Sequence, residues 1–321
     1  MTALPANPIL PAAPGGSGGG PAFTPLVKRS GRRIGERVIE FGLLAAGLFS
    51  VLITAGIVYT LVVETIPFFA HVSIWEFLTG TEWMPLFASP RYGILPLVCG
   101  TLMTTLIALV IAMPVGTIIA IWLSEFAPFR VREVVKPALE LLAAVPTVVF
   151  GYFTLLAVTP LLQKFIPDLP TFNMLGPGLV MGVMIVPYVS SLAEDAMRAV
   201  PMILREGSYA MGANRLTTAW RVVFPAALSG IGAAYTLAMA RAVGETMILA
   251  IAAGQQPNLT FNPTEPAATI TAYIVQVSLG DLPHGSIGYQ SIFAAGLVLF
   301  SMTLVFNLIG SALKRRFRQA Y

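Results

Sequence analysis

Two residues of opposite charge, Arg241 and Glu245, stand four positions apart in the run ARAVGETM, inside a long apolar stretch. An arginine at the centre of a membrane helix costs about 2.5–3.5 kcal/mol on insertion scales, so such a residue needs a compensating role. One interpretation is an i, i+4 ion pair that braces helix packing. The other is a charge on the path of a substrate. The residues alone leave both interpretations open.

A second group of candidate residues precedes this stretch: Glu206, Gly212, Val222 and Pro225. Residues 203–211 are helix formers with apolar side chains at helical spacing, and Gly212 suits the left-handed end of a helix. Residues 215–224 lead to Pro225, which suits the first turn of a new helix. The pattern predicts a short helix across the membrane face between two spans. Without a partner, this segment would be an amphipathic surface helix.

The composition is that of an integral membrane protein. Of the 321 residues, 56% are hydrophobic and 11% are charged, whereas soluble domains carry about a quarter charged residues. Cys99 is the single cysteine, and His71 and His284 stand alone, so we expect no disulfide and no metal site. The chain has no GxxxxGK[ST] motif, so we expect no ATP site of that kind, no cofactor and no catalytic site.

Hydropathy predicts an all-α protein with six transmembrane helices. A helix needs about 20 apolar residues to cross the hydrocarbon core. The predicted spans are 38–63, 94–123, 138–162, 176–194, 226–253 and 291–313. Pro114, Pro146 and Pro187 fall inside spans, where neighbouring helices can re-satisfy the freed backbone groups. Residues 1–27 are rich in Pro and Gly, and we expect a disordered cytoplasmic tail there, followed by one permease domain over 28–321.

The basic residues orient this arrangement. With both termini in the cytoplasm, all of the 19 Lys and Arg residues lie on the cytoplasmic side except Arg91, Lys164 and Arg241. The net charge of +4 is therefore a topology signal. We expect a multi-pass protein of the bacterial plasma (inner) membrane, with lipid and not nucleic acid as a partner.

Two long loops are predicted on the outer side. Residues 64–93 contain Trp75 and Trp83, which are interpreted as aromatic anchors at the membrane interface or as a docking surface for an external partner. Residues 255–290 contain a predicted short helix around 267–279.

The loop at 201–225 resembles the cytoplasmic loop of ABC importer permeases, which has the form EAA-x3-G-x9-I-x-LP. It is present as Glu206-Gly207-Ser208, then Gly212, Val222 and Phe224-Pro225. Gly207 and Ser208 replace two alanines, which weakens the helix somewhat. The resemblance implies a type I importer permease whose coupling helix enters a groove on a separate ATPase subunit.

Four further motifs, GTEWMP, YGILPLVCGTL, WLSEFAP and ARAVGETM, resemble the phosphate-specific permeases of the PstC type over residues 36–314. This resemblance implies that Arg241 and Glu245 take part in phosphate passage. It also implies three partners: a second permease (PstA-like), a dimeric ATPase (PstB-like) and an external phosphate-binding protein (PstS-like).

The function expected from both resemblances is one permease half of an ATP-driven phosphate importer. A guanidinium can bind a tetrahedral oxyanion through two hydrogen bonds, and a carboxylate favours protonated phosphate over sulfate, which has no proton to donate. The alternatives are a permease for sulfate, molybdate or another oxyanion, and an ion-coupled secondary transporter, which needs no coupling loop. A membrane enzyme would need a nucleophile–base or metal constellation, which the sequence lacks.

Overall fold

The computed structural model describes residues 30–85, 87, 89–280, 282–283 and 285–316, so the predicted disordered tail at 1–27 lies outside the described residues. The chain divides into two units, residues 1–56 and 57–321. Helix α1 (Ser30–His71) runs through this boundary and is apolar enough to cross a membrane. The predicted first span, 38–63, is the middle of this helix. In the first unit, the side chains of residues 35–56 are exposed.

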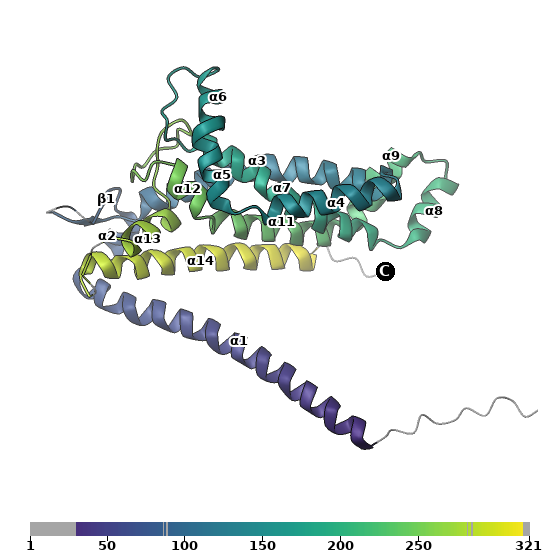
Figure 1. The fold of residues 1–321 in the computed structure, drawn as a ribbon, viewed down its shortest axis with the longest axis horizontal. Helices are drawn as coiled ribbons and strands as arrows, with labels where there is room; N and C mark the ends of the chain where they lie inside the picture. Colours follow the sequence, from purple (N-terminus) through teal and green to yellow (C-terminus); the bar gives the residue numbers. More distant parts are fainter. Residues whose placement is uncertain (1–29, 86, 88, 281, 284, 317–321) are drawn as a thin grey trace, which may run out of the picture. The chain divides into compact units, whose positions relative to one another are not determined.

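Four long helices of the second unit pack side by side (Figure 1). Two of them are α3 (Leu95–Ile121), which a π-helical turn extends as η1 (Trp122–Phe126), and α7 (Leu175–Arg198). The others are α11 (Leu228–Val243) and α14 (Ile287–Arg316). The predicted spans 94–123, 176–194 and 291–313 coincide with α3, α7 and α14. Pro114 and Pro187 lie inside continuous helices.

Small residues set the spacing between α3 and α7. A side chain on Gly116 would meet Val189, and one on Gly182 would meet the Ala108 carbonyl at 3.0 Å. A side chain on Gly178 would meet Ile107 at 2.8 Å. Small residues at helix contacts let two membrane helices approach closely. This packing builds the centre of the second unit.

The predicted span 138–162 is broken in the structure, beside Pro146. The structure has α4 (Phe129–Ala144) and then α5 (Thr147–Phe153), which continues through η2 (Thr154–Val158) and α6 (Thr159–Gln163). The two parts are bent by 83°. The break lies at Val145, whose extended ψ of 131° is the conformation that a following proline imposes.

The predicted span 226–253 is also interrupted. Helix α11 ends at Val243, and a new helix, α12 (Met247–Ala252), begins after three residues. Before α11 come α8 (Met202–Ala210), α9 (Arg215–Thr218), η3 (Ala219–Val223) and α10 (Phe224–Ala226). A bend of 72° separates the segment Arg215–Ala226 from α11.

By length and composition, four described helices can cross a membrane, or up to six if each bent pair is one span. The count of six and the cytoplasmic location of both termini stay predictions. Figure 1 shows α8 and α9 at one end of the second unit, and α2, β1 and α13 at the opposite end. The two ends correspond to the cytoplasmic and outer sides predicted from the sequence.

An aromatic cluster holds together the end of the second unit that carries α2 and α13. It involves α2 (Ile74–Thr79), the two-stranded sheet of β1 (Trp83–Met84) and β2 (Arg91–Tyr92), and α13 (Ile270–Ser278). Trp83 is 2% exposed and makes edge contacts with Phe77, Tyr92 and Tyr273. Both interpretations of Trp83 as a surface residue are therefore wrong, whereas Trp75 is 75% exposed. Burial raises the pKa of Tyr92 and of Tyr273.

Candidate functional site

Arg241, in the last turn of α11, lies against an aromatic ring of α7. Its guanidinium carbon is 4.3 Å from the centroid of the Tyr188 ring, a cation–π contact. Tyr188 stands near the middle of the 24-residue helix α7. The Nε atom of Arg241 is buried and has no hydrogen-bond partner among the described residues. One face of the guanidinium therefore contacts the ring, and within the described part of the chain the Nε–H donor remains free to bind another group.

Glu245 lies in the break between α11 and α12. Its side-chain Oε1 accepts a hydrogen bond of 3.2 Å from the backbone N–H of Met247, and the residue is 7% exposed. Its carbonyl accepts a bond of 2.7 Å from the hydroxyl of Thr271 in α13. The carboxylate therefore lies at the start of α12, while the backbone is held from the outer segment.

The described residues contain no ion pair between Arg241 and Glu245. The i, i+4 interpretation assumed one continuous helix through both residues. Because α11 ends at Val243 and Gly244 follows it, Glu245 leaves the helical register of Arg241. The bracing ion pair is therefore wrong for this structure, and the arginine is stabilised by Tyr188 instead.

The segment of α13 that holds Glu245 is itself fixed to α3. Thr269 caps α13, and the backbone N–H of Ile270 donates 3.1 Å to the hydroxyl of Thr101. Gly100 approaches the Ala268 carbonyl so closely that a side chain at this position would overlap it. These contacts connect α3, α13 and the break at residues 244–246 into one assembly.

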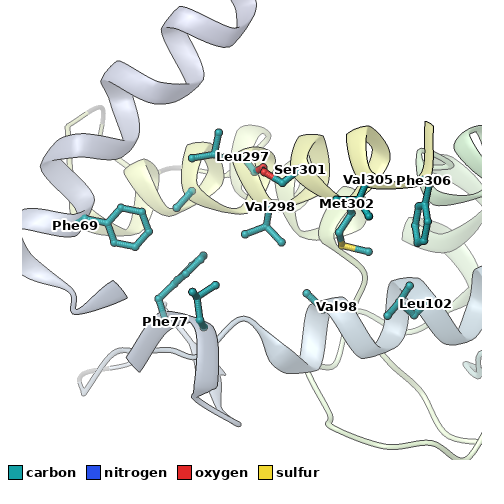
Figure 2. A pocket seen from close by; sticks show the side chains of 12 residues that line it. Phe69, Phe77, Val98, Leu102, Leu297, Val298, Ser301, Met302, Val305 and Phe306 are labelled. Carbon is teal, nitrogen blue, oxygen red and sulfur yellow. The ribbon is translucent and has the colours of Figure 1, made fainter. Parts of the chain in front are cut away.

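A described cavity of the second unit lies elsewhere and does not suit an anion. It encloses about 480 Å³ between the end of α1, α2, α3 and α14 (Figure 2). Ser301 supplies the one hydroxyl of its lining, and the remaining side chains are apolar, among them Phe69, Val98 and Met302. No charge or convergent set of donors is present to replace the hydration of an oxyanion.

The predicted coupling segment is an exposed surface at the opposite end from α13. Glu206 and Gly212 are exposed, and Gly212 has φ of +82°, so the predicted left-handed end of α8 is confirmed. The turn closes through the Gly212 N–H to the Tyr209 carbonyl, 2.9 Å. Asn214 then caps α9 by accepting from the Thr217 N–H, 2.8 Å.

Apolar side chains cover this surface. Met211 is 88% exposed, Ile203 73% and Leu216 64%. The sequence analysis predicted the helical segment 203–211 from the spacing of its apolar residues, but it assigned none of these three residues to the coupling site. Val222 in η3 and Pro225 in α10 are half-buried, so they contribute less to the exposed surface than the three apolar residues do.

Charged residues tie α4 to the same end of α7. Lys136 donates to Glu194 at 2.8 Å and to Asp195 at 2.6 Å, and the side chain of Glu194 is fully buried. Arg198 lies 3.6 Å from the other Glu194 oxygen. Among the described residues, no group of three His, Cys, Asp or Glu side chains could hold a metal ion.

Comparison with known proteins places this arrangement in one family. The model of the family "Binding-protein-dependent transport system inner membrane component" matches residues 112–319. The probable ABC transporter permease YqgH of Bacillus subtilis is 37% identical over 74% of this chain and 77% of its own. The phosphate transport system permease PstC of Xylella fastidiosa is 33% identical over 73% of this chain and 76% of its own.

The fold agrees with a solved structure. A bacterial ABC transporter involved in the import of the acidic polysaccharide alginate aligns with a TM-score of 0.61 at 19% identity, over 89% of this chain and all of that one. At this identity the likeness concerns the fold alone. The chain, with its exposed α8–α9 surface and its broken apolar helices, belongs to the family of inner-membrane components of binding-protein-dependent transport systems.

Proposed function

We propose that the chain is one permease half of an ATP-driven phosphate importer and that Arg241 contacts the anion as it passes. The observation that carries this proposal is the position of Arg241, with a buried Nε that has no described partner, beside the middle of α7. A guanidinium presents paired donors that match a phosphate oxygen pair. The printed name of the Xylella fastidiosa relative supports phosphate as the anion.

The role proposed for Glu245 is discrimination between oxyanions. Phosphate near neutral pH keeps at least one proton that a carboxylate can accept, whereas sulfate would meet repulsion. The Met247 N–H occupies one position on Oε1, so the carboxylate is oriented before substrate arrives. Preorientation lowers the entropic cost of binding.

The exposed α8–α9 surface is the proposed coupling site. Members of this family work with ABC transporter partners, an ATPase and a binding protein. We propose that Glu206 and the apolar residues Ile203, Met211 and Leu216 dock into the ATPase, and that Gly212 sets the turn between the two helices. The specific partners proposed are a PstA-like permease, a PstB-like ATPase dimer and a PstS-like binding protein.

The test is uptake of labelled phosphate by the complex reconstituted in proteoliposomes, with sulfate and molybdate as competitors. Arg241→Lys keeps the charge but loses the planar fork, so we expect assembly without efficient uptake. Glu206→Lys should preserve membrane insertion and lower the phosphate transported per ATP hydrolysed. Uptake of sulfate or molybdate in preference to phosphate would contradict the proposed substrate, and normal uptake in both variants would contradict the proposed sites.

A further inference from the structure

Arg205 is the one buried residue of the coupling helix α8. Its side chain is 10% exposed, whereas its neighbours Ile203 and Glu206 are exposed. The sequence pattern placed Arg205 among the basic residues of the cytoplasmic side, where a solvated side chain is expected. A buried guanidinium at this position therefore needs partners that replace water.

Those partners come from two other helices. The Nη2 atom of Arg205 donates 2.9 Å to Oε1 of Glu125, which is itself 5% exposed at its side chain. Nη1 donates 2.6 Å to the Val200 carbonyl, and Nη2 donates 2.9 Å to the Met197 carbonyl. Nε lies 3.4 Å from both carboxylate oxygens. All three guanidinium nitrogens thus have partners.

The geometry of the guanidinium fits this junction and that of an ammonium does not. Its planar fork can reach a carboxylate on one side and two carbonyls on the other. The hydroxyl of the preceding residue, Ser124, donates a hydrogen bond of 2.9 Å to the same Glu125 oxygen and helps to orient the carboxylate. Ser124 and Arg205 thus donate to the same carboxylate oxygen.

The junction joins α8 to the block formed by α3 and α7. Glu125 belongs to η1, the continuation of α3, Met197 lies in the last turn of α7, and Val200 follows two residues after the end of α7. Along the chain, α8 leads through α9 and α10 to α11. Residues 199–201 connect α7 to α8 along the chain, whereas α3 has no direct connection to α8. The contacts of Arg205 therefore give α8 a second connection to α7 and a direct one to η1 at the end of α3.

We propose that Arg205 and Glu125 are positioning residues that set the orientation of the coupling helix and transmit its displacement to α3 and α7. This inference rests on the proposed function of α8 as the docking helix. When an ATPase moves α8, the rigid charge-assisted contacts carry the movement into the helix block directly. Without them, the displacement would be absorbed by the turn at Val200–Pro201.

The first test measures substrate transported per ATP hydrolysed by the reconstituted complex. The variants are Arg205→Lys and Glu125→Gln, and Arg130→Lys is the matched control because Arg130 is exposed and has no described partner. We expect each junction variant to lower the ratio at least tenfold while the ATPase co-purifies at the normal level. A normal ratio in either variant, or loss of ATPase binding in both, would overturn the positioning role.

A second test needs neither substrate nor ATPase, so it separates this inference from the proposed function. Spin labels at Trp122 in η1 and Ala210 in α8, both exposed, report the orientation of α8 in the purified permease with Cys99 replaced by serine. We expect a narrow distance distribution in the parent and a clearly broader one in Glu125→Gln. An unchanged distribution would overturn the inference even if transport fails.

Discussion

The guanidinium of Arg241 lies over the ring of Tyr188 at 4.3 Å, and this contact takes the place of the expected ion pair with Glu245. An aromatic face stabilises a cation without neutralising it, so the arginine keeps its full charge and its in-plane donors. A carboxylate partner would occupy those donors. The contact thus stabilises the arginine and leaves its Nε without a partner among the described residues, as the proposed anion contact requires.

Removing the ring should impair transport more than removing the hydroxyl. A cation–π contact is worth about 0.5–2 kcal/mol, so Tyr188→Leu should lower the phosphate uptake rate by roughly 2- to 30-fold. Tyr188→Phe should retain at least half of it. Tyr152→Leu, at an exposed tyrosine of α5, is the control. Equal losses in the two Tyr188 variants would show that the hydroxyl, and not the ring, is required.

Exchanging the charges should not restore transport. In Arg241→Glu with Glu245→Arg, the guanidinium moves to the break after α11 and a carboxylate faces Tyr188. Because the structure has no ion pair to preserve, we expect uptake to stay lost while the complex assembles, as judged by co-purification. Uptake near the parent rate in the double variant would instead support a bracing pair.

Two glycines of the coupling segment provide a matched comparison. Both Gly207 and Gly212 have open space where a side chain would begin, but Gly212 alone of the two has a positive φ, +82°. Gly212→Ala should cost about 1–2 kcal/mol at the turn and reduce uptake. Gly207→Ala should strengthen α8 by roughly 1 kcal/mol and leave uptake intact. Uptake assays and thermal unfolding of the complex measure both; equal behaviour would contradict the turn's importance.

The orientation in the membrane is open to cysteine labelling. Ser73 and Ser278 are exposed at the end that carries α2 and α13, and Ala210 is exposed on α8. Cysteines at the first two positions should react with an impermeant thiol reagent on intact cells. A cysteine at Ala210 should react after permeabilisation and not before it. The native Cys99 is buried, so the parent protein provides the background. Labelling of Ala210 from outside would reverse the topology.

The hydroxyl of Thr271 should matter for stability. It donates to the Glu245 carbonyl, which the break in the helix leaves without an intrahelical partner. Thr271→Val keeps the shape and should lower the free energy of unfolding by about 1–3 kcal/mol. Thr271→Ser should be close to the parent. Thermal unfolding of the purified complex checks this, and identical midpoints for Val and Ser would remove the role assigned to the bond.

Hydropathy located the long helices, because an apolar run of sufficient length has few other structures available in a membrane. It did not locate the breaks. Pro114 and Pro187 lie within helices, whereas Pro146 follows a sharp bend, and all three sit in similar apolar surroundings. Whether a proline lies within a helix or beside a break depends on the packing of neighbouring helices, and a local sequence pattern does not contain that information.

Some features of the candidate site could likewise be predicted from local sequence, and others could not. The coupling segment follows a local spacing, and its left-handed glycine was predictable from residue type. The contact of Arg241 with Tyr188 joins two helices that are 53 positions apart in the sequence. The Arg205–Glu125 pair spans 80 positions. Neither follows a periodicity, so only the packed structure reveals them.

The close glycine-mediated approach of α3 and α7 limits how the protein can change shape. Two helices whose surfaces interlock move together, so a displacement is absorbed at a few hinges. The breaks at Val145, at Ala227 and at residues 244–246 are the natural hinges. Tyr188 belongs to α7 and Arg241 to α11, whereas Glu245 lies within the last of these breaks. If the protein changes conformation at these breaks, the contact of Arg241 with Tyr188 depends on the angle between α7 and α11.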